Sequence, residues 1–281
     1  MSYKTPRILQ GNVGNNTFSY AFRKNKSLYI PSLIEGTLDD LILGDEVVFE
    51  EREDGILKSC TGLRNFIRLH DVLSSRKSLE WCTITIFDNH NHAVYFWYEA
   101  LAEWILEAWA ELIHIDEHSD LWDNENDIGI LRRDLDVPVG WGIGGGNGEK
   151  ILEWGQVWKH RVATPEGFGT FSSKSTVSDS EKVWYFTNYQ CNVGNYIAPA
   201  IRDGIVWKVI RIENDYQVDE YMDYTPSENS ILNIDLDFFS PEMSFIDEEK
   251  KLQLIRNLLP KVKCITIATS PYFIDQWVAI R

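Results

Sequence analysis

The chain has little that would build a disulfide framework, a secretory signal or a membrane anchor. Its four cysteines, Cys60, Cys82, Cys191 and Cys264, are widely spaced and form no C-x-x-C pair. This spacing argues against a zinc ribbon and indicates isolated thiols in a reducing compartment. The first residues, MSYKTPRILQ, lack an apolar signal core, and no stretch approaches the roughly 18 apolar residues of a membrane span. We therefore expect a cytoplasmic protein with no membrane partner.

Basic residues are also scarce. The chain has 27 Lys and Arg against 43 Asp and Glu, which gives a formal net charge of −16. Nucleic acid is therefore a poor partner, because neutralising phosphates requires a basic surface. An acidic surface attracts cationic ligands and metal ions, but it equally describes an ordinary acidic protein. The charge is compatible with a metal site without establishing one.

The sequence changes its pattern near residue 78. Before that point short strand-like pieces alternate with turn signals, which predicts a mostly β elaboration over residues 1–78, of unknown function. Residues 79–281 alternate apolar strands with helical stretches, which predicts an α/β domain whose mostly parallel sheet is covered on both faces. We expect strands at 82–87, 111–115, 205–212, 231–239 and 264–269, and helices at 93–111 and 248–259.

The segment 134–177 is read as long loops around a short helix near 151–160. Its GWGIGG stretch, Gly140 to Gly145, formally matches a dinucleotide-binding fingerprint. That fingerprint requires a strand before it and a helix beginning inside it, and neither is predicted here. We interpret the stretch as a flexible loop.

Acidic and imidazole side chains gather where three predicted strands end. Residues at alternate positions share one side of a strand, and the carboxyl ends of parallel strands meet at the sheet edge where ligands bind. We therefore expect these groups to converge. In chain order they are His90 and His92, then Asp116, His118 and Asp120, then Asp235 and Asp237.

Such a gathering predicts a metal site. Buried carboxylates are costly next to one another unless a cation compensates them. Carboxylate and imidazole ligands without thiolate favour manganese over zinc, and there are more ligands than one tetrahedral ion needs, which favours two adjacent ions. A single Asp-x-His is usually a surface turn. Three strand ends with the same kind of residue favour the metal site.

At these residues the chain resembles a known superfamily. DEHSD is similar to the Asp-Ala-His-x-Asp motif of the arginase and agmatinase ureohydrolases, and NIDLDFFSP to their second aspartate motif. FDNHNHAVYFWYEA, HIDEHSDLW, CNVGNYIAPAIRDGIVW, LNIDLDFFS and ATSPYFID follow the order seen in divergent arginase-like proteins. Those include peptide arginases, which convert arginine to ornithine in ribosomally made precursor peptides. The resemblance covers Leu79 to the C-terminus.

The resemblance implies a three-layer α/β/α sandwich of the arginase/deacetylase type that binds two Mn²⁺ ions. It places Asp120 and Asp235 as the bridging pair. His92 then supports a ligand, faces the substrate or is simply a side chain at a helix start, and we favour the last of these. The usual Gly-Gly-Asp-His-Ser context is replaced by FDNHNH, and His160, in a poorly matched region, is no clear counterpart of the proton-shuttling histidine of ordinary arginases. The implied ligands are His90, Asp116, His118, Asp120, Asp235 and Asp237.

The expected activity is manganese-dependent hydrolysis of arginine side chains in a precursor peptide, giving ornithine and urea. Asp120 is expected to pass a proton to the leaving amine. Asp275 is expected either to pair with the guanidinium or to cap a terminal helix. Asn192 and Asn195 are expected to hydrogen-bond substrate. The sequence leaves the oligomeric state open.

Three alternatives remain at this point. One is the same fold acting on a small guanidino or acylated-amine substrate. Another is a deacetylase, which usually holds one zinc with fewer ligands, so that His90, Asp120 and Asp237 argue against it. The third is a non-catalytic binding protein, against which the complete ligand set argues.

Overall fold

The computed structural model describes residues 3–53, 55–69, 82–122, 124, 126, 128 and 179–281. The predicted loops at 134–177, including Gly140–Gly145 and His160, lie outside these residues, as does the predicted boundary between residues 78 and 79. None of the helices found in the described ranges has the length and apolar character needed to cross a membrane.

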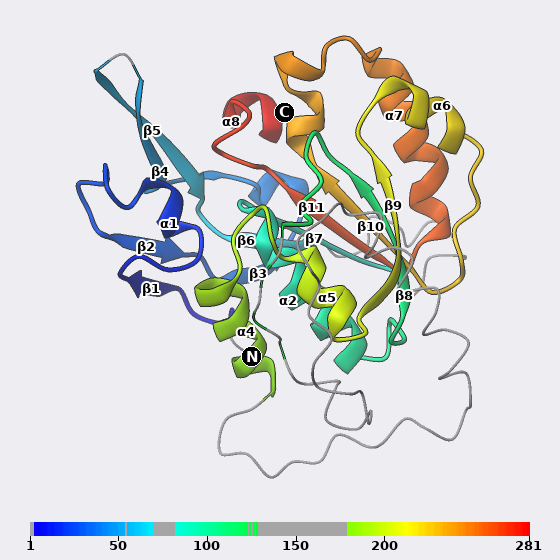
Figure 1. The fold of residues 1–281 in the computed structure, drawn as a ribbon, viewed down its shortest axis with the longest axis horizontal. Helices are drawn as coiled ribbons and strands as arrows, with labels where there is room; N and C mark the ends of the chain where they lie inside the picture. The colour runs from blue at the N-terminus through cyan, green and yellow to red at the C-terminus, as the bar shows by residue number, and fades with distance from the viewer. Residues whose placement is uncertain are drawn as a thin grey trace.

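A seven-stranded sheet organises the chain (Figure 1). Five consecutive strands are all parallel, and their spatial order, which ends at a sheet edge with β9, is β7 (Thr83–Phe87), β11 (Cys264–Ala268), β10 (Ser230–Asp235), β8 (Ala110–Ile115) and β9 (Val206–Ile212). These strands are short and rich in β-branched residues, and β8 and β10 are buried throughout, as strands covered on both faces must be. The predicted α/β class with a mostly parallel sheet is thereby confirmed.

Helices cover both faces of this sheet. On one face α2 (Ala93–Ala102), α4 (Asp179–Tyr185) and α5 (Ile197–Arg202) contribute to a core with the β8 residue Leu112. On the other, α6 (Asp215–Tyr221) and α7 (Glu248–Leu258) join a second core with Ile113. Adjacent strand residues therefore enter opposite cores, as the period of two requires.

The N-terminal part of the chain is β-rich, and part of it belongs to the main sheet. β6 (Phe66–Leu69) pairs antiparallel with β7, and β3 (Leu33–Gly36) pairs parallel with β6 at the sheet edge. Two separate hairpin-like pairs remain: β1 (Arg7–Gln10) with β2 (Ser27–Ile30), and β4 (Leu43–Glu53) with β5 (Ile56–Leu63). The β4–β5 pair projects from the body of the molecule (Figure 1).

Short elements fill the connections. They are α1 (Asn16–Ser19), α8 (Gln276–Ile280), the 3₁₀ turns η1 (Leu38–Asp40), η2 (His90–His92), η5 (Leu236–Phe239), η6 (Pro241–Met243) and η7 (Leu259–Lys261), and the π-turn η4 (Phe186–Gln190).

Two predicted elements are shorter than expected. The helix predicted over 93–111 ends at Ala102, and the chain then turns through Trp104 and Trp109, both with positive φ, before β8 begins. The strand predicted over 231–239 ends at Asp235 and gives way to η5. In both places apolar residues continue past the end of the element, so the residue pattern alone does not show where the helix or strand ends.

Candidate metal centre

The predicted ligands come together at the carboxyl ends of three parallel strands, of which β8 and β10 are neighbours and β7 is separated from β10 by β11. η2 after β7 carries His90, the segment after β8 carries Asp116, His118 and Asp120, and β10 ends in Asp235, with Asp237 in η5. Apart from His118, whose side chain is 42% exposed, all of these side chains are buried. We call these six residues the His–Asp cluster.

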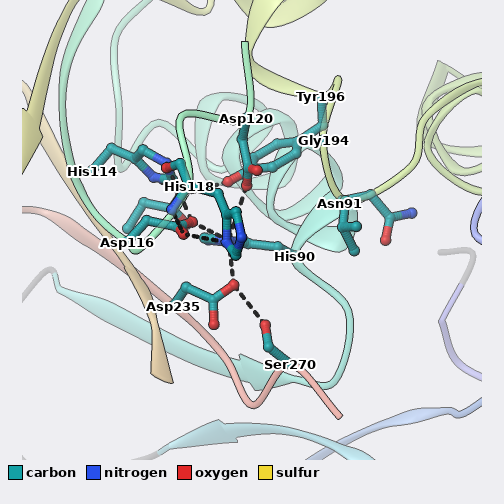
Figure 2. A network of polar contacts seen from close by, with 12 residues as sticks. His90, Asn91, His114, Asp116, His118, Asp120, Gly194, Tyr196, Asp235 and Ser270 are labelled. Atoms are coloured by element: carbon teal, nitrogen blue, oxygen red, sulfur yellow. Dashed lines mark hydrogen bonds and ion pairs between the residues drawn. The ribbon is translucent and has the colours of Figure 1, made fainter. Parts of the chain in front are cut away.

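Three carboxylates converge on one nitrogen of His90 (Figure 2). Its Nδ1 lies 3.0 Å from Asp116 Oδ2, 3.2 Å from Asp120 Oδ2 and 3.0 Å from Asp235 Oδ2. A single proton on Nδ1 can point at only one of these oxygens. Three carboxylate oxygens this close to one imidazole nitrogen are an arrangement that a bound cation would satisfy.

A second group adjoins the first. His118 Nδ1 lies 3.0 Å from Asp237 Oδ2 and 3.6 Å from Asp116 Oδ1. Asp116 therefore turns Oδ2 to His90 and Oδ1 to His118. Two sets of possible ligand atoms lie within 4.8 Å of one another, and Asp116 belongs to both: His90, His114 and Asp116 form one set, and Asp116, His118 and Asp237 form the other. The resemblance implied Asp120 as a bridging residue, but the recorded contacts of Asp120 within the cluster are on the His90 side, so the geometry favours Asp116 as the shared carboxylate.

Tight turns, and not continued strands, bring the side chains together. Asp116 Oδ1 accepts a hydrogen bond from the His118 backbone N–H at 2.6 Å, and Asp235 Oδ1 accepts one from the Asp237 N–H at 2.9 Å. Asp120 has φ +49°, in the left-handed region that aspartate tolerates better than most residues. The expected strand-like alternation beyond residue 115 is therefore wrong, because each strand ends in a turn closed by its own aspartate.

The charges of the cluster are mutually unfavourable without a cation. Burial, reinforced by the charge of Asp116, raises the pKa of Asp120 to about 7. Burial together with Asp235 and Asp116 raises the pKa of Asp237 well above its ordinary value. Hydrogen bonds to Asp116 and Asp237 raise the pKa of His118 to about 11. Protons are thus held where a cation would otherwise balance the carboxylates.

The donor set fits divalent metal ions. Asp116 Oδ2 and both ring nitrogens of His90 are buried and make no hydrogen bond within the described part of the chain. Donor atoms about 2.1 Å from one octahedral ion lie about 3 Å from each other, which matches the spacing around His90 Nδ1. Oxygen and imidazole donors without thiolate suit a hard or borderline ion such as Mn²⁺. The residues therefore fit the metal that the sequence predicts.

A series of buried polar side chains in contact with one another leads from Asp116 to Trp97. His114 Nε2 lies 3.3 Å from Asp116 Oδ2, and its Nδ1 lies 3.0 Å from Asn233 Nδ2. Asn233 accepts from the Thr266 hydroxyl at 2.7 Å, which in turn accepts from the Trp97 indole N–H at 3.1 Å. Such partners orient metal ligands and tune their basicity.

Sequence reasoning missed His114, although a signal for it exists. It precedes Asp116 by two residues and so shares its side of β8, the same alternation that suggested the other ligands. It was missed because it lies inside an apolar strand. Ser270, which follows β11, was also missed. Its hydroxyl donates to Asp235 Oδ2 at 2.6 Å (Figure 2). Ser270 lies within the ATSPYFID stretch, but the resemblance assigned it no role.

His92 faces away from the cluster. Its Nδ1 lies 2.6 Å from the Tyr3 hydroxyl, and its ring packs against Phe66 and Phe87 in the core. Burial lowers its pKa to about 3, so it is neutral. His92 lies just before α2, in keeping with its interpretation as a side chain at a helix start.

The side chains predicted to contact substrate make hydrogen bonds within their own segments of the chain. Asn192 Oδ1 accepts from the Gly194 N–H at 3.0 Å, and Asn195 Oδ1 accepts from the Asn192 N–H at 2.8 Å, so both side chains shape their own loop. Asp275 is exposed and caps α8 by accepting from the backbone N–H groups of Trp277 and Val278. Substrate contact by these three residues stays a prediction.

A cavity of about 350 Å³ opens onto the cluster. His118, Asp120 and Asp235 line it together with Ser270. The remaining lining is mostly aromatic or aliphatic, and it comes from Asn15, Phe18, Val48, Phe49, Asn89, Ser119, Trp122, Val193, Gly194, Tyr272 and Phe273.

Comparisons with protein-family models, with curated proteins and with solved structures returned no match to this chain. The geometry of the cluster and the cavity therefore carries the functional argument.

Proposed function

We propose that the protein is a binuclear metal-dependent hydrolase that acts on the guanidinium group of arginine side chains in a precursor peptide. The observation that carries this proposal is the pair of His–Asp groups that share Asp116, next to a cavity that His118, Asp120 and Asp235 help to line. His90, Asp116, Asp120 and Asp235 would hold one ion, and Asp116, His118 and Asp237 the other. Mn²⁺ is proposed because the ligands are carboxylates and imidazoles.

Two such ions, when bound, supply Lewis acidity and generate a nucleophile from water at neutral pH. The chain's own residues do the rest. Asp120 lies beside His90 and also lines the cavity, so its carboxylate is placed to receive a proton from water and pass it to the leaving nitrogen. Ser270 holds Asp235 in place through the 2.6 Å hydrogen bond from its hydroxyl.

The proposed reaction consumes one water and balances without another reactant. Water adds to the guanidinium carbon, the bond from that carbon to the side-chain nitrogen breaks, and the products are urea and a primary ammonium. An arginine residue thereby becomes ornithine. A cavity of about 350 Å³ is near the lower limit for ligand pockets and suits a single side chain.

The same volume supports an alternative, because it also suits a small guanidino or acylated-amine compound. The resemblance of HIDEHSDLW and LNIDLDFFS to arginase-like proteins supports the guanidinium substrate, and the order of the five motifs supports the peptide. Metal analysis of purified protein distinguishes a binuclear manganese hydrolase from a deacetylase. About two manganese ions per chain would support the hydrolase proposed here, and about one zinc would favour a deacetylase.

The decisive experiment is mass spectrometry of an arginine-containing peptide incubated with manganese-loaded protein. Conversion of arginine to ornithine removes CN₂H₂, a loss of about 42 Da per residue in this hydrolysis. The Asp116→Asn variant, treated in the same way, should leave the peptide mass unchanged. Urea released from a free guanidino compound without any peptide conversion would establish the small-guanidino alternative, and no urea from either substrate would refute hydrolysis of a guanidinium altogether.

A further inference from the structure

The N-terminal segment forms part of the cavity that leads to the His–Asp cluster. Asn15 and Phe18, in and next to α1, and Val48 and Phe49, in β4, all line it. We call these four residues the N-terminal wall. They precede the described part of the ligand-bearing region, which begins at Cys82, so the cavity is assembled from both ends of the chain.

A run of rings in tilted and edge-to-face contact connects this wall to a predicted ligand. The ring centroids of Phe49 and Tyr272 are 3.8 Å apart, those of Tyr272 and Phe273 are 4.7 Å apart, and those of Phe273 and His118 are 4.7 Å apart. The Tyr272 hydroxyl also donates to Glu51 of β4 at 3.2 Å. Phe49 therefore supports the rings that cover His118.

Asn15 attaches the wall to the loop that carries His90. Its Nδ2 donates to Asn91 Oδ1 at 2.5 Å, and its Oδ1 accepts from the Val193 N–H at 2.9 Å. Next to it, Gly14 has φ +53°, and a Cβ at this position would lie 2.0 Å from the Asn188 carbonyl oxygen. This close approach and the two buried hydrogen bonds fix the segment against the site.

We propose that the N-terminal wall selects the substrate, with Phe18 and Phe49 receiving a planar cationic group on an apolar stem. This inference rests on the proposed function for the reaction, but the binding it describes can be measured separately. The wall supplies ring faces, and aromatic faces attract guanidinium groups through stacking and cation–π interaction.

The charge of the site agrees with such a ligand. The four aspartates of the cluster would be balanced by two divalent ions, so the loaded centre would not repel a cation. Among the described residues that line the cavity there is no Lys or Arg. A free carboxylate on the ligand would therefore find no cationic side chain among these residues, whereas an apolar stem would find aromatic and aliphatic walls.

Binding tests the wall without requiring turnover. Calorimetric titration of manganese-loaded protein would use n-butylguanidinium and its neutral analogue n-butylurea. We expect the guanidinium to bind at least about tenfold more tightly, and Phe18→Ala and Phe49→Ala each to weaken its binding about tenfold. Phe22→Ala and Ile56→Ala are matched controls, since both side chains are exposed and neither lines the cavity. Thermal unfolding checks the fold, and Phe49→Leu keeps the apolar bulk but removes the ring face.

Kinetics with an arginine peptide give the second readout. Phe18→Ala should raise KM about tenfold and leave kcat within about twofold, because it removes a contact made in both the bound and the reacting states. Equal affinities and KM values in wild type, Phe18→Ala and Phe49→Ala would refute the role of the N-terminal wall in substrate selection, while the proposed function would stand. Tight, Phe18-dependent guanidinium binding without hydrolysis would uphold the wall and refute the reaction. Absence of guanidinium binding by wild type would overturn the wall directly.

Discussion

Asp116 differs from the other carboxylates of the cluster because its two oxygens face two different histidines of the cluster. Oδ2 lies against His90, and Oδ1 faces His118. Asp120 reaches only the first of these histidines in the recorded contacts. Substitution of the two aspartates should therefore have unequal effects on metal content, although the chemical change is the same.

We expect Asp116→Asn to bind almost no manganese and Asp120→Asn to keep about one ion per chain, against about two in wild type. The reason is that the first substitution would weaken both groups, whereas the second would leave Asp116, His118 and Asp237 intact. Inductively coupled plasma mass spectrometry of dialysed protein measures this ratio. Equal losses in the two variants would show that Asp116 is not the shared ligand.

For individual residues, the sequence predicts which side chains lie together but not which atoms contact one another. Parallel strands end at one edge, so aspartates after β8 and β10 could be expected to lie near each other. The sharing role of Asp116 depends on the turn that its own Oδ1 closes with the His118 N–H. An i to i+2 spacing fits a strand and such a turn equally well, so the contact partners could not be deduced.

Among the elements, β8 is held at its start by a buried charged residue that plays no part in the site. Glu111 Oε1 accepts from Lys208 Nζ at 2.6 Å and from the Tyr224 hydroxyl at 2.7 Å, and Oε2 accepts from the Ser227 N–H at 2.7 Å. Burial alone would raise the pKa of Glu111, but these hydrogen bonds hold it below the ordinary value. The ionised form therefore ties β8 to β9 and to the segment before β10.

Glu111→Gln should lower the free energy of unfolding by about 1.5–3 kcal/mol at pH 7, the range for hydrogen bonds to a charged group. A carboxyl with a depressed folded pKa stabilises above its unfolded pKa of about 4.3, and this contribution is lost as pH falls through the lower folded pKa. The difference in free energy of unfolding between wild type and Glu111→Gln should thus become smaller below about pH 4.3. Urea unfolding across pH measures it, with exposed Glu242→Gln as control; a gap independent of pH would contradict the ionised role.

Element types were easier to predict than element ends. Helix α7 has its signals in the sequence, since Asp247 caps its N-terminus by accepting from the Lys250 N–H and Pro260 follows its last turn. Helix α2 has none at its C-terminus. Neither Gly nor Pro occurs between Ala93 and Glu111, and the chain turns at two tryptophans with positive φ. Where a helix is apolar on all sides, as α2 is, the residue pattern does not show the position of the turn that ends it.

For the whole molecule, the N-terminal segment is structurally continuous with the sheet that carries the site. β6 pairs with β7, Tyr3 contacts His92, and Asn15 contacts Asn91. Sequence patterns separated this segment because its strands are short and its turns frequent. The pairing of β6 with β7 depends on long-range contacts that local periodicity cannot express.

Metal binding should stabilise the whole fold, because the donor atoms converge only in the folded chain. At a manganese concentration of about 100 times Kd, each site contributes about 2.7 kcal/mol, which should raise Tm by about 5 °C or more. A net charge of −16 could produce a weaker, nonspecific gain with any divalent cation. That component is screened in about 0.15 M salt, whereas binding at buried ligands is not. Differential scanning calorimetry of wild type and Asp116→Asn in this salt separates the two. A gain in wild type that disappears in the variant is expected; equal gains in both would mean that manganese acts on the acidic surface and not at the cluster.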